Sequence, residues 1–491
     1  MAGIGVKLNK IYEKNTIMSD LYGFVYSTIV TIGPMLVVMA AVLLMRYLLG
    51  FSALGYAERK LYSCTLLYMF LFSFLIVALF TPVLSRYLSD TLYEERYEDI
   101  LPSYYAGLFM TLLAGCCLGV PFCLHEHFVG EVPVTYVFTG FCGYICLIMS
   151  VYGMTFLSFT KDYKRIAQIF FAGMLFAVLL SFLFCYLLGM EGSYSALLGL
   201  TFGFFIIAAL EYGQVRHFFG VNSGRYLPLL GYYRKYWQLI FINFLYVLGL
   251  YVHNFVFWTT DLGTVVAKSF ICAEPYDVAT CVAMFTNIAA SVIFISRVEM
   301  RFRFRYKAHT EAVIGGRWMD IRTTKRRMFR QVSDELFNLV RIQFIVSVAI
   351  YLIVVLLMPR IGYGGLVMEF YHCLAAGYFV LFIMYSAILF LFYFNDLSGA
   401  LMVSGLFCAT VFLGSLICVH LPYIWGGLGT FAGALAGFIA AYFRLRWIES
   451  NFDTHTFCTG RILKPAAGVR PSGKVFDRRN GIDETQLVIR K

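Results

Sequence analysis

The segment from Leu61 to Leu84 reads LYSCTLLYMFLFSFLIVALFTPVL and contains no charged side chain. A helix needs roughly 20 apolar residues to cross about 30 Å of hydrocarbon, so this segment is long enough to span a membrane. Its apolar residues do not alternate with period two, which argues against a strand of a membrane barrel. The segment therefore predicts a transmembrane helix.

Eleven further segments of this kind occur, and 60% of all residues are hydrophobic, well above soluble usage. We predict an all-α, polytopic membrane protein with twelve transmembrane helices. The predicted spans are Leu21–Met45, Leu61–Leu84, Pro102–Leu124, Val134–Thr160, Ile166–Leu188, Tyr194–Val215, Tyr236–Thr260, Val278–Ser296, Ile342–Met358, Phe370–Phe394, Leu397–Val419 and Tyr423–Phe443.

Basic residues lie between the spans, and their distribution predicts the orientation. If the N-terminus is cytoplasmic, 33 of the 39 Lys and Arg residues fall in cytoplasmic segments and five in external loops, with Arg341 at the edge of span nine. Lys and Arg are retained on the cytoplasmic side, so we expect both termini there. Because the charge of +11 is spread over many loops, we expect no nucleic-acid partner.

The span pattern predicts five parts of the chain. They are a cytoplasmic N-terminal segment (1–20, interfacial helix or frayed tail), a first six-helix bundle (21–215), a cytoplasmic linker (216–235), a second six-helix bundle (236–443) with a basic cytoplasmic insertion (297–338), and a cytoplasmic tail (444–491). Spans two and eight both end in Ser-Arg, which hints at a duplication of six helices. We interpret the basic insertion mainly as a topological anchor near anionic lipid.

Polar residues inside the spans are the candidates for a transport path. On span seven, Asn243, Tyr246, His253 and Asn254 share an arc of roughly 100° with Leu250. Such residues often serve helix packing, but related groups on the equivalent first span favour a shared central path. The remaining candidates are Ser27 and Thr31 with the helix-bending Pro34 on span one, and Thr280, Asn287 and Ser291 on span eight.

Signals for an enzyme, a metal or a cofactor are missing from the sequence. There is no P-loop, no Gly-rich nucleotide turn and no HExxH motif. The thirteen cysteines show no CxxC and no zinc spacing, so we interpret them as small apolar residues of helices. The cluster His125-Glu126-His127 falls in a short predicted external loop, and we interpret it as solvated surface.

Several short motifs occur in a specific order over residues 1 to about 405. They are Gly3-Ile4-Gly5, the SRYLSDTLY stretch of Ser85–Tyr93 with Arg86 and Asp90, Leu101-Pro102, Leu157-Ser158 with Asp162-Tyr163, Phe255–Trp258, Glu274–Asp277, Arg297-Val298-Glu299, and Tyr393–Asp396 before Gly399–Leu401. In this ordered set the chain resembles the PelG family, the membrane transporters of Pel exopolysaccharide. One departure is His253-Asn254, where the family pattern leads us to expect an Asp-Lys pair.

This resemblance implies a MOP-flippase-like fold, with two six-helix bundles around a central cavity and alternating access. It implies export of a polymer rich in N-acetylgalactosamine across the bacterial cytoplasmic membrane, for a biofilm matrix. The implied partners are the polysaccharide, a cytoplasmic glycosyltransferase, a cyclic-di-GMP receptor membrane subunit and a further membrane subunit. The motif positions that the resemblance marks are Arg86, Asp90, Trp258, Asp277, Arg297, Glu299 and Asp396.

Three other functions remain open at this point. A MATE-like cation antiporter would use a carboxylate in spans one, two, seven or eight, where the sequence has none. A flippase for pyrophosphate-linked oligosaccharide would need buried Lys or Arg to offset phosphate charge, and the predicted cavity-forming spans lack these as well. A membrane glycosyltransferase or polymerase would need a larger catalytic loop. The charge-poor spans favour an uncharged glycan as cargo.

Overall fold

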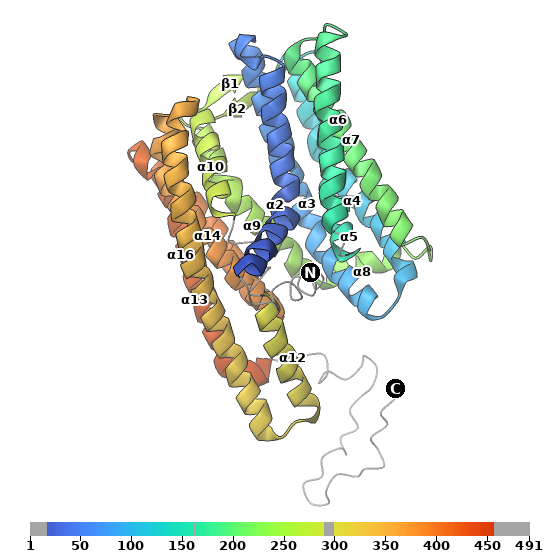
Figure 1. Ribbon diagram of the computed structural model, residues 1–491, viewed down its shortest axis with the longest axis vertical. Coiled ribbons are helices and arrows are strands. Elements are labelled where there is room, and N and C mark those ends of the chain that lie inside the picture. The colour runs from blue at the N-terminus through green and yellow to red at the C-terminus, as the bar shows by residue number, and fades with distance from the viewer. Residues whose placement is uncertain (1–16, 161–162, 289–298, 456–491) are drawn as a thin grey trace, which may run out of the picture. The chain divides into compact units, whose positions relative to one another are not determined.

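The computed structural model describes residues 17–160, 163–288 and 299–455. It divides into two compact units, 1–441 and 442–491. The helices are α2 (Ile17–Leu48), α3 (Tyr56–Tyr93), α4 (Ile100–Phe128), α5 (Val134–Thr160), α6 (Tyr163–Tyr186), α7 (Gly192–Phe218), α8 (Leu227–Lys235), α9 (Trp237–Trp258), α10 (Glu274–Asn287), α12 (Glu299–Gly315), α13 (Trp318–Leu357), α14 (Leu366–Tyr393), α15 (Leu397–Cys418) and α16 (Leu428–Asp453). Short 3₁₀ helices are η1 (Phe51–Ala53), η2 (Tyr97–Asp99), η4 (Pro359–Ile361) and η5 (Tyr423–Trp425). Figure 1 shows their arrangement.

Among the residues that the structure describes, ten helices are long and apolar enough to cross a membrane. They correspond to predicted spans two to seven and nine to twelve. Predicted span one lies on α2, and the first part of span eight lies on α10, whose continuation falls outside the described residues. The all-α, polytopic class is confirmed, and the structure supports ten of the twelve spans by length and composition.

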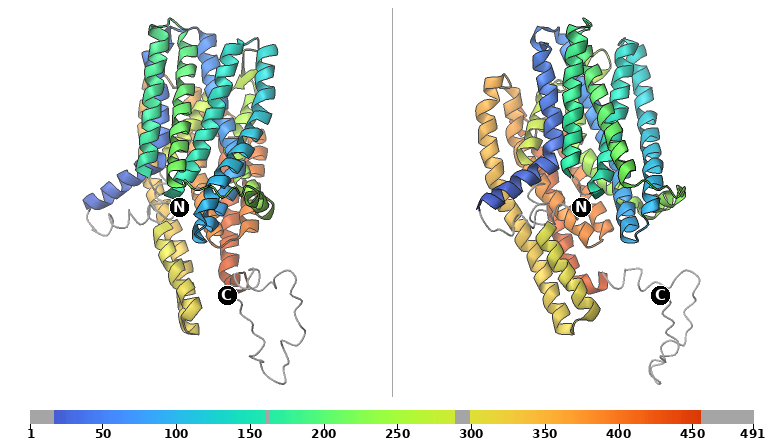
Figure 2. Two further views of the ribbon diagram at one scale, coloured as in Figure 1. Left: turned by 90° about the vertical axis from the view of Figure 1, so that its right-hand side faces the viewer. Right: turned by 45° about the vertical axis from the view of Figure 1, so that its right-hand side comes forward.

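Helices α2 to α7 pack against one another, and we call them the first helix set. Within this set, α5 and α6 contact α7, α3 and α4 contact α5, and α2 contacts α6. We call α9, α10, α13, α14 and α15 the second helix set, in which α9 packs on α15 and α10 on α14. Contact between α3 and α9 joins the two sets (Figures 1 and 2).

A small β-hairpin between α9 and α10 was not predicted from the sequence. Its strands β1 (Thr264–Val266) and β2 (Phe270–Cys272) are antiparallel, with Thr264 opposite Cys272. The turn places Ala267 and Lys268 at φ of 47° and 58°. A tight hairpin turn of this kind favours Gly or Asn at such positions, so the sequence carried no turn signal here. We call this end of the molecule the hairpin end.

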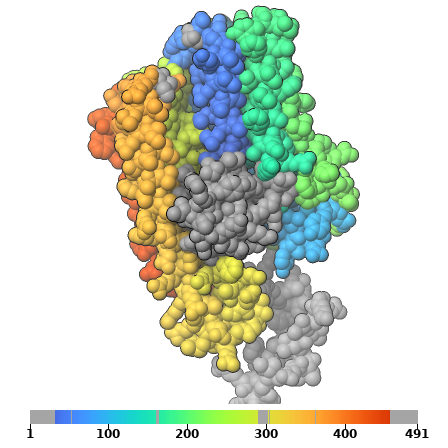
Figure 3. All heavy atoms as spheres, in the orientation of Figure 1, coloured from blue at the N-terminus to red at the C-terminus, as the bar shows by residue number. Residues whose placement is uncertain are grey.

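The predicted insertion forms helical structure at the opposite end, which we call the insertion end. Helix α12 packs against α13, which runs without interruption from Trp318 to Leu357. In the space-filling view of Figure 3, the yellow surface of this helical pair forms a projection. The helix therefore begins at Trp318, 24 residues before the start of predicted span nine at Ile342.

The bent helix α2 holds Pro34 in its interior, and Pro34 is buried. Figures 1 and 2 show the ribbon of α2 changing direction along its length. Proline lacks the N–H for the helical hydrogen bond and its ring crowds the preceding turn, which explains a bend. The side chains of Ser27 and Thr31, also on α2, lie outside the described set, as does the predicted interfacial segment up to residue 16.

Candidate transport site

The polar residues of α9 do not all face one space. The Asn243 amide donates to the Ala78 carbonyl of α3 at 2.9 Å and so lies between the two helix sets. Tyr246, in contrast, stacks on Tyr385 of α14 with 4.5 Å between ring centres. The predicted arc is therefore divided between the boundary of the sets and the interior of the second set.

His253, another of the predicted path residues, is fully buried in the second set. Its Nδ1 lies 2.9 Å from the Tyr276 hydroxyl, and its Nε2 lies 3.3 Å from the Tyr378 hydroxyl. The Tyr378 hydroxyl also donates to the Leu250 carbonyl at 3.1 Å. Buried polar groups need such partners, so this arrangement ties α9, α10 and α14 together.

Asp277, at the start of α10, gathers two other predicted residues around its carboxylate. The Asn254 amide donates to Oδ1 at 2.7 Å, and the Trp258 indole N–H lies 2.9 Å from the same oxygen. The backbone N–H of Ala273 donates to Oδ2 at 3.1 Å. The structure thus brings together Asn254, a transport-path candidate, with Trp258 and Asp277, two family-motif positions. Nothing in the sequence connected these two groups of residues.

The polar residues of α10 also serve packing. Asn287 donates to the Ala375 carbonyl of α14 at 2.9 Å and accepts from the Ser347 hydroxyl of α13 at 2.7 Å. Thr280 is buried, and its hydroxyl has no hydrogen-bond partner among the described residues. Ser291 lies outside the described residues.

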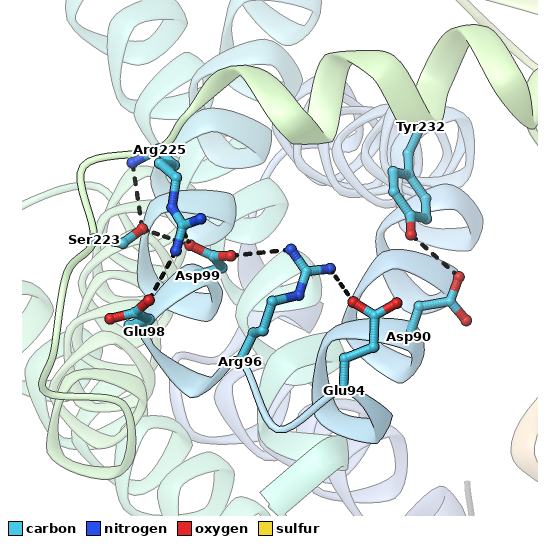
Figure 4. A network of polar contacts seen from close by, with 8 residues as sticks. All are labelled: Asp90, Glu94, Arg96, Glu98, Asp99, Ser223, Arg225 and Tyr232. Carbon is cyan, nitrogen blue, oxygen red and sulfur yellow. Dashed lines mark hydrogen bonds and ion pairs between the residues drawn. The ribbon is translucent and has the colours of Figure 1, made fainter. Parts of the chain in front are cut away.

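Motif positions Arg86 and Asp90 lie near the insertion end of α3. Arg86 Nε is 3.4 Å from Asp90 Oδ1, and the Arg86 guanidinium lies 5.6 Å from the centre of the Tyr236 ring. Asp90 also accepts from the Tyr232 hydroxyl of α8 at 3.3 Å (Figure 4). Through Tyr232 and Tyr236, these contacts attach α8 and the residue after it, which connect the two helix sets, to α3.

The same connecting chain is fixed to a buried carboxylate, that of Asp99. Figure 4 shows Arg96 and Arg225 converging on it, with N–O distances of 3.2 Å and 3.1 Å. The Ser223 hydroxyl donates to Asp99 Oδ1 at 2.6 Å, and Arg225 also pairs with Glu98. A buried carboxylate is stable only with such compensation, so this network holds the connecting segment on the first set.

The remaining motif positions contribute to helix ends or fall outside the described part. Asp396 is buried and its Oδ1 accepts from the Gly399 N–H at 3.2 Å, which caps the start of α15. Glu299 is the first residue of α12, and its side chain is not among those described. Arg297 lies outside the described residues.

At the hairpin end, three residues of α3 contact the β-hairpin and the adjoining ends of α9 and α10. Lys60 pairs with Glu274, Cys64 meets Cys272, and the Tyr68 hydroxyl donates to the Ile271 carbonyl at 3.0 Å and accepts from the Ile271 N–H at 3.2 Å. Tyr68 also stacks nearly parallel on Trp258, with 5.2 Å between ring centres. We call these contacts of Lys60, Cys64 and Tyr68 the hairpin junction. They hold the two helix sets together at this end.

Glu126 corrects one of the sequence interpretations. Helix α4 extends to Phe128 and Glu126 is only 1% exposed, so the interpretation as solvated surface is wrong for Glu126, whereas His125 and His127 are exposed. The Ser269 hydroxyl of the β-hairpin donates to its carboxylate, and the neighbouring pair Lys268–Glu131 also joins the hairpin to the first set. Glu126 is buried because the β-hairpin covers its carboxylate. The interpretation from the sequence failed because the hairpin was not predicted.

Beside the junction, an apolar cavity of about 120 Å³ lies within the first set. Aromatic side chains of α3, α4 and α5 line it, including Phe72, Phe122 and Tyr144, and Phe270 of the hairpin completes the wall. Deeper in this set, Glu211 is fully buried, and neither carboxylate oxygen has a partner in the described part of the chain. Within the same part, no cluster of three His, Cys, Asp or Glu side chains could hold a metal ion.

This arrangement of helices is shared with solved membrane transporters. An inward-facing MATE family multidrug transporter aligns with a TM-score of 0.57 and 12% identity over 84% of this chain and 95% of that chain. A Vibrio cholerae MATE transporter gives 0.57 and 12% over 92% and 99%, and a Pyrococcus furiosus MOP superfamily transporter gives 0.55 and 13% over 86% and 96%. The molecule therefore has the fold of the MOP and MATE transporters.

The family follows from the sequence itself. Residues 1–457 match the PelG family, described as "Putative exopolysaccharide Exporter (EPS-E)". The chain belongs to the PelG family, a family of transporters and not of enzymes. A search of curated proteins found no matching sequence. The resemblance seen in the ordered motifs is confirmed, as is the prediction of a membrane transporter.

Proposed function

We propose that this chain exports an uncharged Pel-type exopolysaccharide, rich in N-acetylgalactosamine, across the bacterial cytoplasmic membrane for a biofilm matrix. The match to an exopolysaccharide exporter family over residues 1–457 is the observation that carries this proposal. The absence of charged residues from Leu61–Leu84 of α3 and from Trp237–Trp258 of α9, which meet where the two sets join, supports a neutral cargo.

The proposed route follows the boundary between α3 and α9. Phe72 and Phe255 stand opposite each other there, with 6.3 Å between ring centres, and both are half-buried. Asn243 offers an amide at the same boundary. Aromatic faces pack on the C–H surface of sugar rings and amides bond sugar hydroxyls, so this boundary suits a neutral glycan. His253, Asn254, Thr280 and Asn287 would then act by keeping the second set rigid.

We further propose that the hairpin end faces outward and that the two six-helix bundles are the moving bodies. Export then requires α3 to separate from the β-hairpin and α10, which breaks the hairpin junction. The linker 216–235 would move with the first bundle, because α8 and the preceding loop are bonded to Asp90 and Asp99.

The route is tested by removing the two aromatic rings proposed to line it. Replacing Phe72 and Phe255 together by Ala should lower surface polymer several-fold, measured with a lectin for N-acetylgalactosamine on intact cells. A matched control is Phe171→Ala, because Phe171 of α6 is 59% exposed on the surface of the first set. Immunoblots of the membrane fraction must show equal amounts of all variants. Undiminished polymer in the double variant would place the route elsewhere.

The proposed partners are a cytoplasmic glycosyltransferase, a cyclic-di-GMP receptor membrane subunit and a further membrane subunit. The basic α12–α13 projection supplies surface for such partners at the insertion end, and the sequence of the tail 444–491 is a second candidate. Purification from the native host in mild detergent should retain the glycosyltransferase, identified by mass spectrometry. Recovery of the transporter alone in several detergents would contradict a synthase complex.

A further inference from the structure

Two cysteines, one on α3 of the first helix set and one on the β-hairpin, meet at the hairpin junction. Cys64 lies on α3 and Cys272 lies on β2, 208 positions apart in the chain, and their sulfur atoms are 2.8 Å apart. Both residues are buried, with exposed fractions of 1% and 4%. From the sequence we interpret the cysteines as small apolar residues of helices. Spacing along the chain cannot show that two cysteines this far apart lie side by side.

The position of the pair is fixed from both sides. Lys60, Cys64 and Tyr68 are spaced four residues apart and so lie along one face of α3, and all three contact the β-hairpin or the start of α10. On the other side, pairing with Thr264 of β1 holds Cys272 in place, and the Thr264 hydroxyl donates to the Cys272 carbonyl at 3.1 Å. Cys64 is thus the middle of three contacts that must all break when the junction opens.

We propose that Cys64 and Cys272 form a reversible disulfide that locks the hairpin junction closed until it is reduced. The proposal rests on the proposed function in one respect, the outward orientation of the hairpin end. The space outside the cytoplasmic membrane is oxidising, whereas the cytoplasm keeps thiols reduced. A covalent bond between α3 and β2 would prevent the separation of the sets that export requires.

The chemistry is thiol–disulfide exchange with a disulfide oxidant. The Cys272 thiolate attacks one sulfur of the oxidant, which forms a mixed disulfide and releases one oxidant thiolate. The Cys64 thiolate then displaces the second oxidant sulfur, so that two protons leave the protein thiols and the oxidant ends as a dithiol. Exchange with an external dithiol reverses both steps and reopens the pair.

The charges and hydrogen bonds around the pair indicate which of the two sulfur atoms attacks the oxidant first. The hydrogen bond from the Cys64 thiol is the largest influence and lowers the pKa of the Cys272 thiol to about 7. The Thr264 hydroxyl and the Lys60 ammonium act in the same direction, whereas burial and the Asp277 carboxylate raise the pKa. A thiol with a pKa near the ambient pH is the most effective nucleophile in exchange, so Cys272 attacks first.

The disulfide itself is tested on full-length protein in native membranes. Membranes are treated with diamide or with dithiothreitol, free thiols are blocked with N-ethylmaleimide, and the digest is searched for a peptide that links Cys64 to Cys272. We expect the linked peptide after diamide and its loss after dithiothreitol. Cys64→Ser should lack it, whereas Cys281→Ser, which changes an exposed cysteine of α10, should keep it. No linked peptide after diamide would overturn the proposal.

The lock is tested by export in the same cells. Diamide should stop the appearance of new surface polymer in the wild type and in Cys281→Ser, and dithiothreitol should restore it. Export by Cys64→Ser and by Cys272→Ser should not change with diamide. Full export by protein that carries the linked peptide would overturn the lock. Wild-type cells that export no polymer under reducing conditions would contradict the proposed function, while the peptide assay would still decide whether the disulfide forms.

Discussion

At the scale of single residues, Asp277 concentrates much of the polar structure near the hairpin end. Asn254, Trp258 and the backbone of Ala273 all donate to its carboxylate, and the two side chains are buried. The carboxylate stands in the first turn of α10, where the helix dipole favours a negative charge. Asp277 therefore connects the end of α9 to the start of α10, on the two sides of the β-hairpin.

Removing this acceptor should destabilise the protein. Asp277→Ala leaves an indole N–H, an amide and a backbone N–H without their acceptor, and each unsatisfied buried donor costs about 1–3 kcal/mol. Asp277→Asn keeps one acceptor oxygen, so its effect should be smaller. The melting temperature of detergent-purified protein should fall in the order wild type, Asn variant, Ala variant. Asp261→Ala, in the exposed loop before β1, serves as control, and equal melting of both Ala variants would contradict this role.

Residue spacing predicted the faces of helices but not their neighbours. The helical arc on α9 grouped Asn243 with His253 by their angle around the helix, yet Asn243 contacts α3 while His253 contacts Tyr276 and Tyr378. The side of a helix follows from its period, whereas its partner depends on how distant segments pack. For the same reason the sequence could not pair Trp258 with Asp277 or Glu126 with Ser269.

At the scale of elements, close backbone contact holds α15 and α16 together. A Cβ atom added at Gly429 would lie 2.5 Å from the Ser415 nitrogen and 2.7 Å from the Gly414 carbonyl carbon. Small residues permit such an approach between membrane helices, where packing replaces the hydrophobic effect as the driving force. The neighbouring helix α9 meets α15 similarly at Gly249, beside the Phe407 ring.

Gly429→Ala should therefore lower the melting temperature, because the backbone atoms opposite cannot move aside as a side chain can. Overpacking of this kind costs about 1–3 kcal/mol. Gly405→Ala is the matched control, since its Cβ would meet only a Leu245 methyl at 4.0 Å. That variant should melt at or above the wild type, because Ala favours a helix by up to about 1 kcal/mol over Gly. A Gly429 variant as stable as the Gly405 variant would contradict the close contact.

Most elements could be predicted because the membrane imposes them. A span must be helical and roughly 20 residues long, so hydropathy alone located α3 to α7, α9 and α13 to α16. Outside the membrane this constraint ends. The sequence missed α8, the β-hairpin and the extension of α13 before residue 342, because local charge and turn residues there carry weak signals.

At the scale of the whole molecule, orientation is the property on which the transport proposal depends. The Lys and Arg distribution predicts that the insertion end is cytoplasmic and the hairpin end external. Both ends can be examined with one probe, because Gly315 at the end of α12 and Gly316 after it are exposed at the insertion end, and Asp261 is exposed at the hairpin end.

A protease site inserted between Gly315 and Gly316 should be cut in inside-out membrane vesicles and protected in intact spheroplasts. The same site inserted after Asp261, before the β-hairpin, should show the opposite pattern. Immunoblots of a C-terminal tag give the fragment sizes, and detergent-solubilised samples control for access to each site. Cleavage of the Gly315 site in intact spheroplasts would reverse the proposed direction of transport.

Helix α13 is one continuous rod of 40 residues, so it is about 60 Å long at roughly 1.5 Å per residue. About 30 Å of it suffices to cross the hydrocarbon, and the remainder extends beyond it as part of the projection. For a straight helix, a tilt of about 10° in the membrane moves the far end by about 5 Å over roughly 30 Å. The projection thus carries any tilt of α13 within the membrane to a point outside it, where the displacement is largest.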